Sequence, residues 1–253
     1  MSLMQSSNPA LSDRIFSRSL SVPSSETMTV QGTVNKTLLM LLLVILGAVY
    51  TWKIFFESMN PSSVYTWMLI GGIGGFITSL VIIFKPKTSA YIAPVYSILE
   101  GLFLGGISAI FAAQYGGSQI VMQAIALTFG TFLVMLAAYK TGVIKATQKF
   151  RTGVIAATGA IALVYFVTWI LSMFGLNSMG YIHGSGTVGI VIGFVVVIVA
   201  ALNLILDFDF IEKGAAMGAP KYMEWYGAFG LMITLVWLYI EILKLLARFA
   251  KRD

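Results

Sequence analysis

Cysteine is absent from this sequence of 253 residues, and histidine occurs once, at His183. Without a thiol the chain can form no disulfide bond, iron–sulfur cluster or thiolate zinc site. A single imidazole likewise excludes a metal site built from several histidines. His183 lies in the loop-like stretch GYIHGSG, where a lone histidine is usually solvated, and we assign it no role. We therefore expect no metal-binding site in this chain.

Charged residues are also scarce, at 10% of the chain, while 58% of its residues are hydrophobic. Soluble domains carry roughly 25% charged residues. The imbalance comes from seven long apolar runs, each close to the ~20 residues that a helix needs to cross about 30 Å of hydrocarbon. None shows the polar alternation of a membrane β-barrel. We therefore predict an all-α polytopic membrane protein with seven transmembrane helices in a lipid bilayer. The runs are Thr37–Phe56, Val64–Phe84, Tyr91–Ala113, Ile120–Tyr139, Gly153–Phe174, Thr187–Leu206 and Tyr226–Phe249.

Residues 1–35 contain few apolar side chains and many serines, threonines and asparagines. A segment of this kind buries too little apolar surface to offset the entropy lost on ordering. We predict a flexible cytoplasmic tail over residues 1–35 and a transmembrane domain over residues 36–253. Residues 1–30 contain no apolar core of a signal peptide, so we expect the first membrane helix to act as the targeting signal.

The net charge of +6 arises from lysines and arginines that gather in alternate connections. The tail and the second, fourth and sixth connections carry them, whereas the first, third and fifth loops carry none. Connections rich in lysine and arginine stay in the cytoplasm, so this pattern predicts a cytoplasmic amino terminus. We interpret the charge as a topology signal and expect no nucleic-acid partner.

The carboxyl-terminal end does not follow this alternation. Four basic residues lie at the end of the seventh run or beyond it, at Lys244, Arg248, Lys251 and Arg252. If the run crosses the membrane, these residues lie outside the cell, against the rule. If it re-enters, they stay in the cytoplasm. We expect a crossing, because the run is long enough to span the hydrocarbon.

Glycines cluster at Gly71–Gly75 in the second run and at Gly101 and Gly105 in the third. Small residues let the backbones of membrane helices approach closely. We expect these glycines to serve helix packing rather than ligand binding.

Glu100 lies near the middle of the third run, in YSILEGLFLG. An ionisable side chain exposed to lipid at this depth would cost about 2.5–3.5 kcal/mol on insertion scales, so we expect Glu100 to face the protein interior. It is either an acid that fixes helix packing or an acid that lines or gates an ion pathway.

Asp207 and Asp209 end the sixth run in LNLILDFDFIE and are two residues apart. At that spacing they point to different faces of a helix and cannot form a chelating pair by themselves. Asp209 is four residues from Lys213 and can pair with it, which suggests that Asp209 is the solvated member. Asp207 continues the stripe that begins at Asn203, and we expect it to face inward. For each, the alternative is an acid that merely adds charge to the helix end.

Glu241 lies inside the seventh run, in LVWLYIEILKLL, and two partners are open to it. Lys244 could form a local ion pair and extend toward the membrane interface. Asp207 could come level with Glu241 if the sixth helix continues toward Lys213 and the seventh helix starts late. Two carboxyl groups within about 4–6 Å cannot easily both ionise, so they would share a proton. Loss of that proton would then favour separation of the two helices.

Three segments, YSILEGLFLG, LNLILDFDFIE and GLMITLVWLYIEILKLLARF, occur in this order among the seven runs. Together they resemble the Bax inhibitor-1 family, and more narrowly its bacterial YccA-like branch, over most of residues 36–250. The resemblance implies a Bax inhibitor-1-like bundle in the cell inner (plasma) membrane. We expect the last helix to be central, because it carries an acid in its middle.

The family pattern has one aspartate at the end of the sixth helix, commonly in an Asp-Thr-Gln stretch, and a second in the last helix. Asp207 takes the first place, with Phe208 and Asp209 following it, and Glu241 takes the second. The resemblance implies that this late pair controls a calcium leak in response to pH. Because no arginine lies inside an early apolar run, we expect no arginine latch on Asp207.

No nucleophile–base arrangement is evident, so we expect neither an enzyme nor a cofactor. The first function hypothesis is a pH-sensitive calcium (cation) leak channel gated by Asp207 and Glu241, with Glu100 and Asp209 as further pathway residues. Inward carboxylates suit calcium, which prefers oxygen ligands, although the ion itself is implied by the resemblance. The alternative is a non-transporting regulator of a membrane protease, or of a stress or cell-death response.

Overall fold

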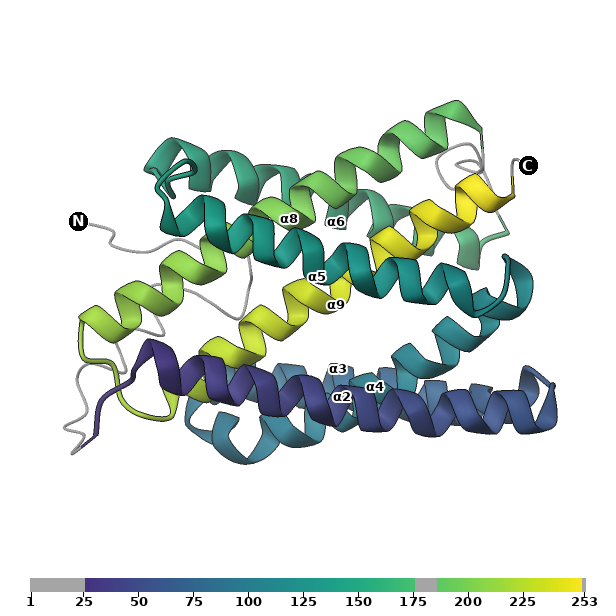
Figure 1. The fold of residues 1–253 in the computed structure, drawn as a ribbon, viewed down its shortest axis with the longest axis horizontal. Helices are drawn as coiled ribbons and strands as arrows, with labels where there is room; N and C mark the ends of the chain where they lie inside the picture. Colours follow the sequence, from purple (N-terminus) through teal and green to yellow (C-terminus); the bar gives the residue numbers. More distant parts are fainter. Residues whose placement is uncertain (1–25, 176–185, 252–253) are drawn as a thin grey trace.

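The computed structural model describes residues 26–175 and 186–251, and these form a bundle of long α-helices (Figure 1). Seven of the helices are long and apolar enough to cross a membrane. Within the described ranges the only β pairing is an isolated bridge between Thr27 and Pro220. The prediction of an all-α polytopic bundle is confirmed, while His183 and residues 1–25 of the predicted tail lie outside the described residues. The elements are α2 (Val30–Ser58), α3 (Ser62–Phe84), the short 3₁₀ helix η1 (Pro86–Thr88), α4 (Ser89–Gln114), α5 (Ser118–Lys140), α6 (Gln148–Met173), α8 (Thr187–Ala216) and α9 (Met223–Ala250).

Several helices extend beyond the apolar runs that mark them in the sequence. The first begins at Val30 rather than Thr37, with the side chain of Thr29 accepting a hydrogen bond from the backbone N–H of Gly32 as its N-cap. α8 continues past Leu206 to Ala216, as the sequence allowed, but α9 already begins at Met223. These extra turns contain polar and charged residues, so hydrophobicity does not reveal them.

The last helix occupies the centre of the bundle, as predicted. In Figure 1, α9 runs obliquely across the molecule, with α5, α6 and α8 to one side and α2, α3 and α4 to the other. It packs against α8, α2, α5 and α4, and 72% of its most apolar stretch is buried. The helix is unbroken from Met223 to Ala250, so its two ends lie at opposite ends of the bundle.

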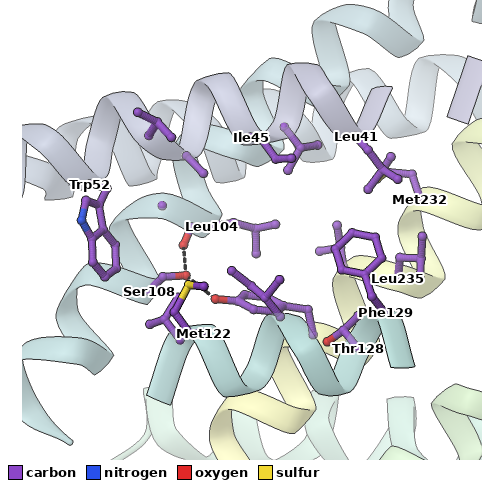
Figure 2. Close-up of a pocket in the computed structure, with 18 of the residues that line it drawn as sticks. Leu41, Ile45, Trp52, Leu104, Ser108, Met122, Thr128, Phe129, Met232 and Leu235 are labelled. Atoms are coloured by element: carbon purple, nitrogen blue, oxygen red, sulfur yellow. Dashed lines mark hydrogen bonds between the residues drawn. The ribbon is translucent and has the colours of Figure 1, made fainter. Parts of the chain in front are cut away.

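The glycines of α4 allow a close approach to α2, as predicted. A Cβ atom at Gly101 would lie 2.3 Å from the carbonyl oxygen of Val44, and one at Gly105 would lie 2.2 Å from that of Ala48. Real Cβ atoms do not tolerate such contacts, so this interface requires glycine. Beside this contact lies a cavity of about 430 Å³ between parts of α2, α4, α5 and α9, and Val44, Ala48 and Gly105 are among its lining residues (Figure 2).

α6 differs from the other helices because it is hardly buried. Only 6% of its most apolar stretch is covered by protein, and its buried residues are Arg151 and Val154. Apolar packing therefore contributes little to holding α6 against the rest of the molecule, and its polar contacts become important.

Candidate functional site

Three polar side chains on one face of α6 reach the central helices α8 and α9. They are spaced by seven residues, which is close to two helical turns, so they follow one another along a single stripe. Each forms a hydrogen bond or ion pair with a polar side chain on α8 or α9. We call this set the polar ladder, and its rungs are Arg151–Asp209, Thr158–Asn203 and Tyr165–Glu241.

The first rung is a buried ion pair. The Arg151 guanidinium donates to the carboxylate of Asp209, and its Nε donates to the carbonyl oxygen of Ala146 at 3.0 Å. Lys213 lies 2.9 Å from the other carboxylate oxygen, which confirms the pairing expected at a spacing of four residues. Asp209 is only 9% exposed, so the prediction that it is the solvated acid is wrong. It is buried because a second cation from α6 covers it.

Arg151 is the functional candidate that the sequence analysis missed. The apolar run starts at Gly153, which placed Arg151 in the preceding loop, but α6 begins at Gln148 after the N-cap Thr147. An arginine in a membrane helix therefore does hold an aspartate of α8, although the partner is Asp209. The signal that could have revealed it is the recurrence of Arg151, Thr158 and Tyr165 every seven residues in an otherwise largely apolar stretch.

The second rung joins two neutral side chains. The amide nitrogen of Asn203 donates to the hydroxyl of Thr158 at 2.9 Å and to the carbonyl oxygen of Val199 at 2.8 Å. Asp207 follows Asn203 by one turn on the same face of α8, and it is fully buried, as the stripe had suggested. The inward face of α8 thus presents an amide and a carboxylate to the bundle interior.

The third rung is centred on Glu241, whose side chain is buried in α9. Its two carboxylate oxygens accept hydrogen bonds from Lys244 and from the hydroxyl of Tyr165, both at 3.0 Å. The Lys244 ammonium also lies 5.3 Å from the centre of the Tyr165 ring, which is within the range of a cation–π interaction. The sequence left Lys244 and Asp207 open as partners of Glu241, and in the structure the partner is Lys244.

The register between α8 and α9 separates Asp207 from Glu241. A Cβ atom at Gly227 would lie 3.2 Å from Ile211, and one at Gly193 would lie 3.1 Å from Leu245, so both ends of this antiparallel pair share one register. Asp207 is then level with about residue 231, roughly ten residues from Glu241, which corresponds to about 15 Å along the helices. A shared proton would have required a register in which Glu241 comes level with Asp207. The register set by these two glycine contacts does not bring the two carboxyl groups together.

Glu100 lies elsewhere, between α3 and α4. It is half-buried, and a Cβ atom at Gly75 of α3 would lie 2.9 Å from its carboxylate. The acid therefore faces protein, as expected, at the glycine-rich contact between these two helices. Glu100 is not part of the polar ladder, and its position at the α3–α4 contact favours a role in helix packing.

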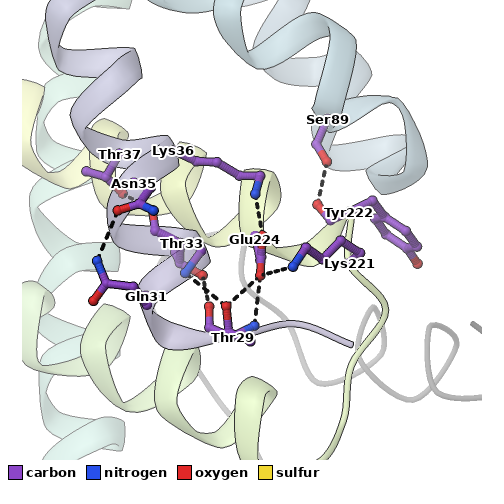
Figure 3. A network of polar contacts seen from close by, with 11 residues as sticks. Thr29, Gln31, Thr33, Asn35, Lys36, Thr37, Ser89, Lys221, Tyr222 and Glu224 are labelled. Carbon is purple, nitrogen blue, oxygen red and sulfur yellow. Dashed lines mark hydrogen bonds and ion pairs between the residues drawn. The ribbon is translucent and has the colours of Figure 1, made fainter. Parts of the chain in front are cut away.

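A further carboxylate, Glu224, is fully buried and was not among the predicted pathway residues; its polar contacts are shown in Figure 3. It accepts hydrogen bonds from the backbone N–H of Thr29 at 2.9 Å and from the hydroxyl of Thr29 at 2.8 Å. Lys36 pairs with it directly, and Lys221 lies 3.2 Å away. Glu224 thereby ties the start of α2 to the start of α9.

The chain just before α2 also pairs with the connection between α8 and α9. The backbone N–H of Met28 donates to the carbonyl oxygen of Ala219 at 2.6 Å, and that of Lys221 donates to Glu26 at 3.2 Å. We call residues 26–29 the amino-terminal strap. The strap and Glu224 join the start of α2 to the start of α9 and to the connection that precedes it. These contacts lie at the same end of the bundle as the Arg151–Asp209 ion pair.

Within residues 26–175 and 186–251 no group of three or more histidines, cysteines, aspartates or glutamates could hold a metal ion. Three of the buried carboxylates, Asp209, Glu224 and Glu241, are instead paired with lysine or arginine side chains.

Among the described residues, six membrane-length helices and a buried, charge-bearing last helix define a multi-pass helical membrane protein. The chain matches the family described as Bax inhibitor 1 like across residues 8–251, and it belongs to that family. No curated protein matches it. The resemblance seen in the sequence is thus confirmed for the family, while the narrower YccA-like branch stays a prediction.

Proposed function

We propose that this protein is a pH-sensitive leak for cations, with calcium as the permeant ion, and that the polar ladder is its gate. The observation that supports this proposal is the attachment of α6. This helix buries little apolar surface and is bonded to α8 and α9 through carboxylates in two of three rungs. Because α6 is held mainly by bonds to carboxylates, protonation of those carboxylates would weaken its attachment.

The proposed gate depends on the charge of Asp209 and Glu241. While both carry a negative charge, they pair with Arg151 and Lys244 and accept the Tyr165 hydroxyl. Protonation removes these charges and leaves Arg151 as a buried cation without its counter-ion, which is strongly unfavourable. Moving α6 away lets the arginine regain polar surroundings. Acid therefore opens the gate in this proposal, the opposite sign to that expected from a proton shared by Asp207 and Glu241.

An open ladder would also supply ligands for a cation. Calcium prefers oxygen ligands from carboxylates and amides, and the inward face of α8 carries Asn203 and Asp207, both buried. We propose that displacement of α6 exposes this face to water and that the ion passes along it. The protein acts in this view by conduction and not by catalysis. The basic residues at the ladder's ion-pair end support a cytoplasmic location for that end and suit a bacterial inner membrane.

The test is calcium flux from proteoliposomes that contain the purified full-length protein, measured with an internal dye between pH 5.5 and 8. We expect flux that increases as the pH falls. The variant Asp207→Asn should reduce flux at every pH while keeping its pH profile, because this residue lines the path without forming a rung. Glu57→Gln, at an exposed acid paired loosely with Lys53, is the matched control.

The absence of flux at every pH from a protein that is folded and inserted would reject the leak. That outcome would favour the alternative function, a non-transporting regulator of a membrane protease or of a stress or cell-death response. Affinity capture from the source membrane would then be the next measurement.

A further inference from the structure

The cavity between α2, α4, α5 and α9 lies on the other side of α9 from the polar ladder. Tyr239 lines it, whereas Glu241, two residues later, faces α6. Its volume of about 430 Å³ falls within the roughly 300–1,000 Å³ of pockets that bind small molecules. Figure 2 shows Leu41, Ile45, Phe129 and Leu235 around the opening between the helices. No charged side chain lines it, so the proposed ion path does not pass through it.

The few hydroxyl groups in the wall are already satisfied by the protein. Ser108 donates to the carbonyl oxygen of Leu104 and is bonded to the Tyr239 hydroxyl, both at 2.6 Å. Thr128 donates to the carbonyl oxygen of Ala124 at 2.7 Å. Ser118, the remaining hydroxyl of the lining, is exposed at the start of α5. A polar ligand would lose its hydration in this cavity and find little in return, whereas hydrocarbon would lose nothing.

The mouth of the cavity is continuous with the surface that faces lipid. It is formed by apolar side chains of α2 and α5 that are themselves exposed, including Ile45 at 54%, Val49 at 58% and Met122 at 64%. All three belong to membrane-spanning helices. The molecules that meet this mouth are therefore the acyl chains of the bilayer, and a dry apolar void would forfeit dispersion contacts that a chain could make.

We propose that this cavity is a binding site for an acyl chain of a bilayer phospholipid. The chain enters between α2 and α5 and packs against Leu235 and Tyr239 of the central helix. The site holds the hydrocarbon and leaves the headgroup at the membrane surface, because its wall provides no charged partner. This inference depends on the helices spanning a bilayer and is independent of the proposed leak.

Photochemical labelling tests the proposal directly. The full-length protein is placed in nanodiscs of phosphatidylcholine and phosphatidylglycerol that contain a phosphatidylcholine with a diazirine at the end of one acyl chain. After illumination, mass spectrometry locates the adducts. We expect Met122, Ile125 and Ile45 to carry about tenfold more adduct than Leu133 and Val134. These two residues lie on the same helix as Met122, are 60% and 66% exposed, and do not line the cavity.

A filled cavity supplies the second measurement. In the variant Val49→Phe with Val121→Phe, two new rings occupy the space, and labelling at Met122 should fall about tenfold. Val134→Phe adds a ring to the lipid-facing surface outside the cavity and should change nothing. Val49→Phe alone is the fallback variant, since the exposed Val49 side chain can be enlarged without disturbing the core.

Three results would overturn the proposal. Equal labelling at Met122 and Val134 would show ordinary lipid contact. Labelling by a photoreactive free fatty acid but not by the phospholipid would assign the site to another ligand. Protein–protein adducts through the same residues would show that a second copy of the chain covers the mouth.

Discussion

Arg151 of α6 and Asp209 of α8 form an ion pair inside the bundle, with the arginine 4% exposed and the aspartate 9% exposed. A pair at this depth adds little net stability, because both charges are taken out of water. The pair instead favours one position of α6 against α8, because removing either charge leaves the other one buried. Loss of either charge therefore penalises the observed position of α6 against α8.

Replacing Arg151 with methionine should release α6 from α8. Asp209 keeps Lys213 as a partner, so we expect a loss of stability at the lower end of the about 3–5 kcal/mol seen when a buried pair is broken. Calcium flux at neutral pH should increase. Thermal unfolding in detergent and flux measurements check this, with Lys53→Met, at an exposed pair, as the control. Unchanged flux in a destabilised Arg151 variant would separate this ion pair from the gate.

The pH dependence should originate in Asp209 and Glu241. Both carboxylates accept hydrogen bonds from cationic side chains, and such bonds are weaker when the acceptor carries no charge. Asp209→Asn and Glu241→Gln should raise flux at neutral pH, and the double variant should conduct with almost no pH dependence. Flux of the parent that increases toward alkaline pH would contradict opening by acid and would favour release by loss of a proton.

Tyr165→Phe should have a smaller effect than either carboxylate variant. It removes the hydrogen bond to Glu241 but keeps the ring beneath Lys244. We expect a loss of about 1 kcal/mol, typical of a single hydrogen bond, and a modest rise in flux at neutral pH. Tyr65→Phe, at a residue 52% exposed on α3, is the matched control and should leave both quantities unchanged.

Glu224→Gln should loosen the amino-terminal strap. The carboxylate accepts from Thr29, Lys36 and Lys221, and hydrogen bonds to charged groups contribute about 1.5–3 kcal/mol. We expect hydrogen exchange to accelerate over residues 26–36, with little change in α5. Glu57→Gln should have no such effect, because an exposed pair contributes about 0–1 kcal/mol. Equal exchange in the two variants would show that Glu224 does not hold the strap.

The ends of the chain should lie on opposite sides of the membrane. The part of the chain that the structure describes has seven membrane-length helices before residue 251, and α9 is unbroken. Reporter fusions at each end should therefore give opposite signals, with the amino-terminal one cytoplasmic. Matching signals would require one of the seven helices to re-enter rather than cross, which would restore the charge rule for Arg248 and Lys251.

The sequence by itself determined which segments are helices and that Glu100, Asp207 and Glu241 face protein. Length and hydrophobicity suffice for the first, because a span must cover the hydrocarbon and satisfy its own backbone. The cost of placing charge in lipid suffices for the second, and Glu100, Asp207 and Glu241 all contact or enter the protein interior.

Only the tertiary structure decided which partner each acid has. Partners on different helices depend on the register and rotation of those helices, which periodicity does not specify. The register that the contacts of Gly227 and Gly193 set between α8 and α9 keeps Asp207 and Glu241 apart. The pairing of Arg151 with Asp209 could not be predicted for the same reason, because nothing local to either residue indicates that α6 lies beside α8. Local spacing did predict the partners within one helix, Lys213 and Lys244, since the α-helix fixes their geometry.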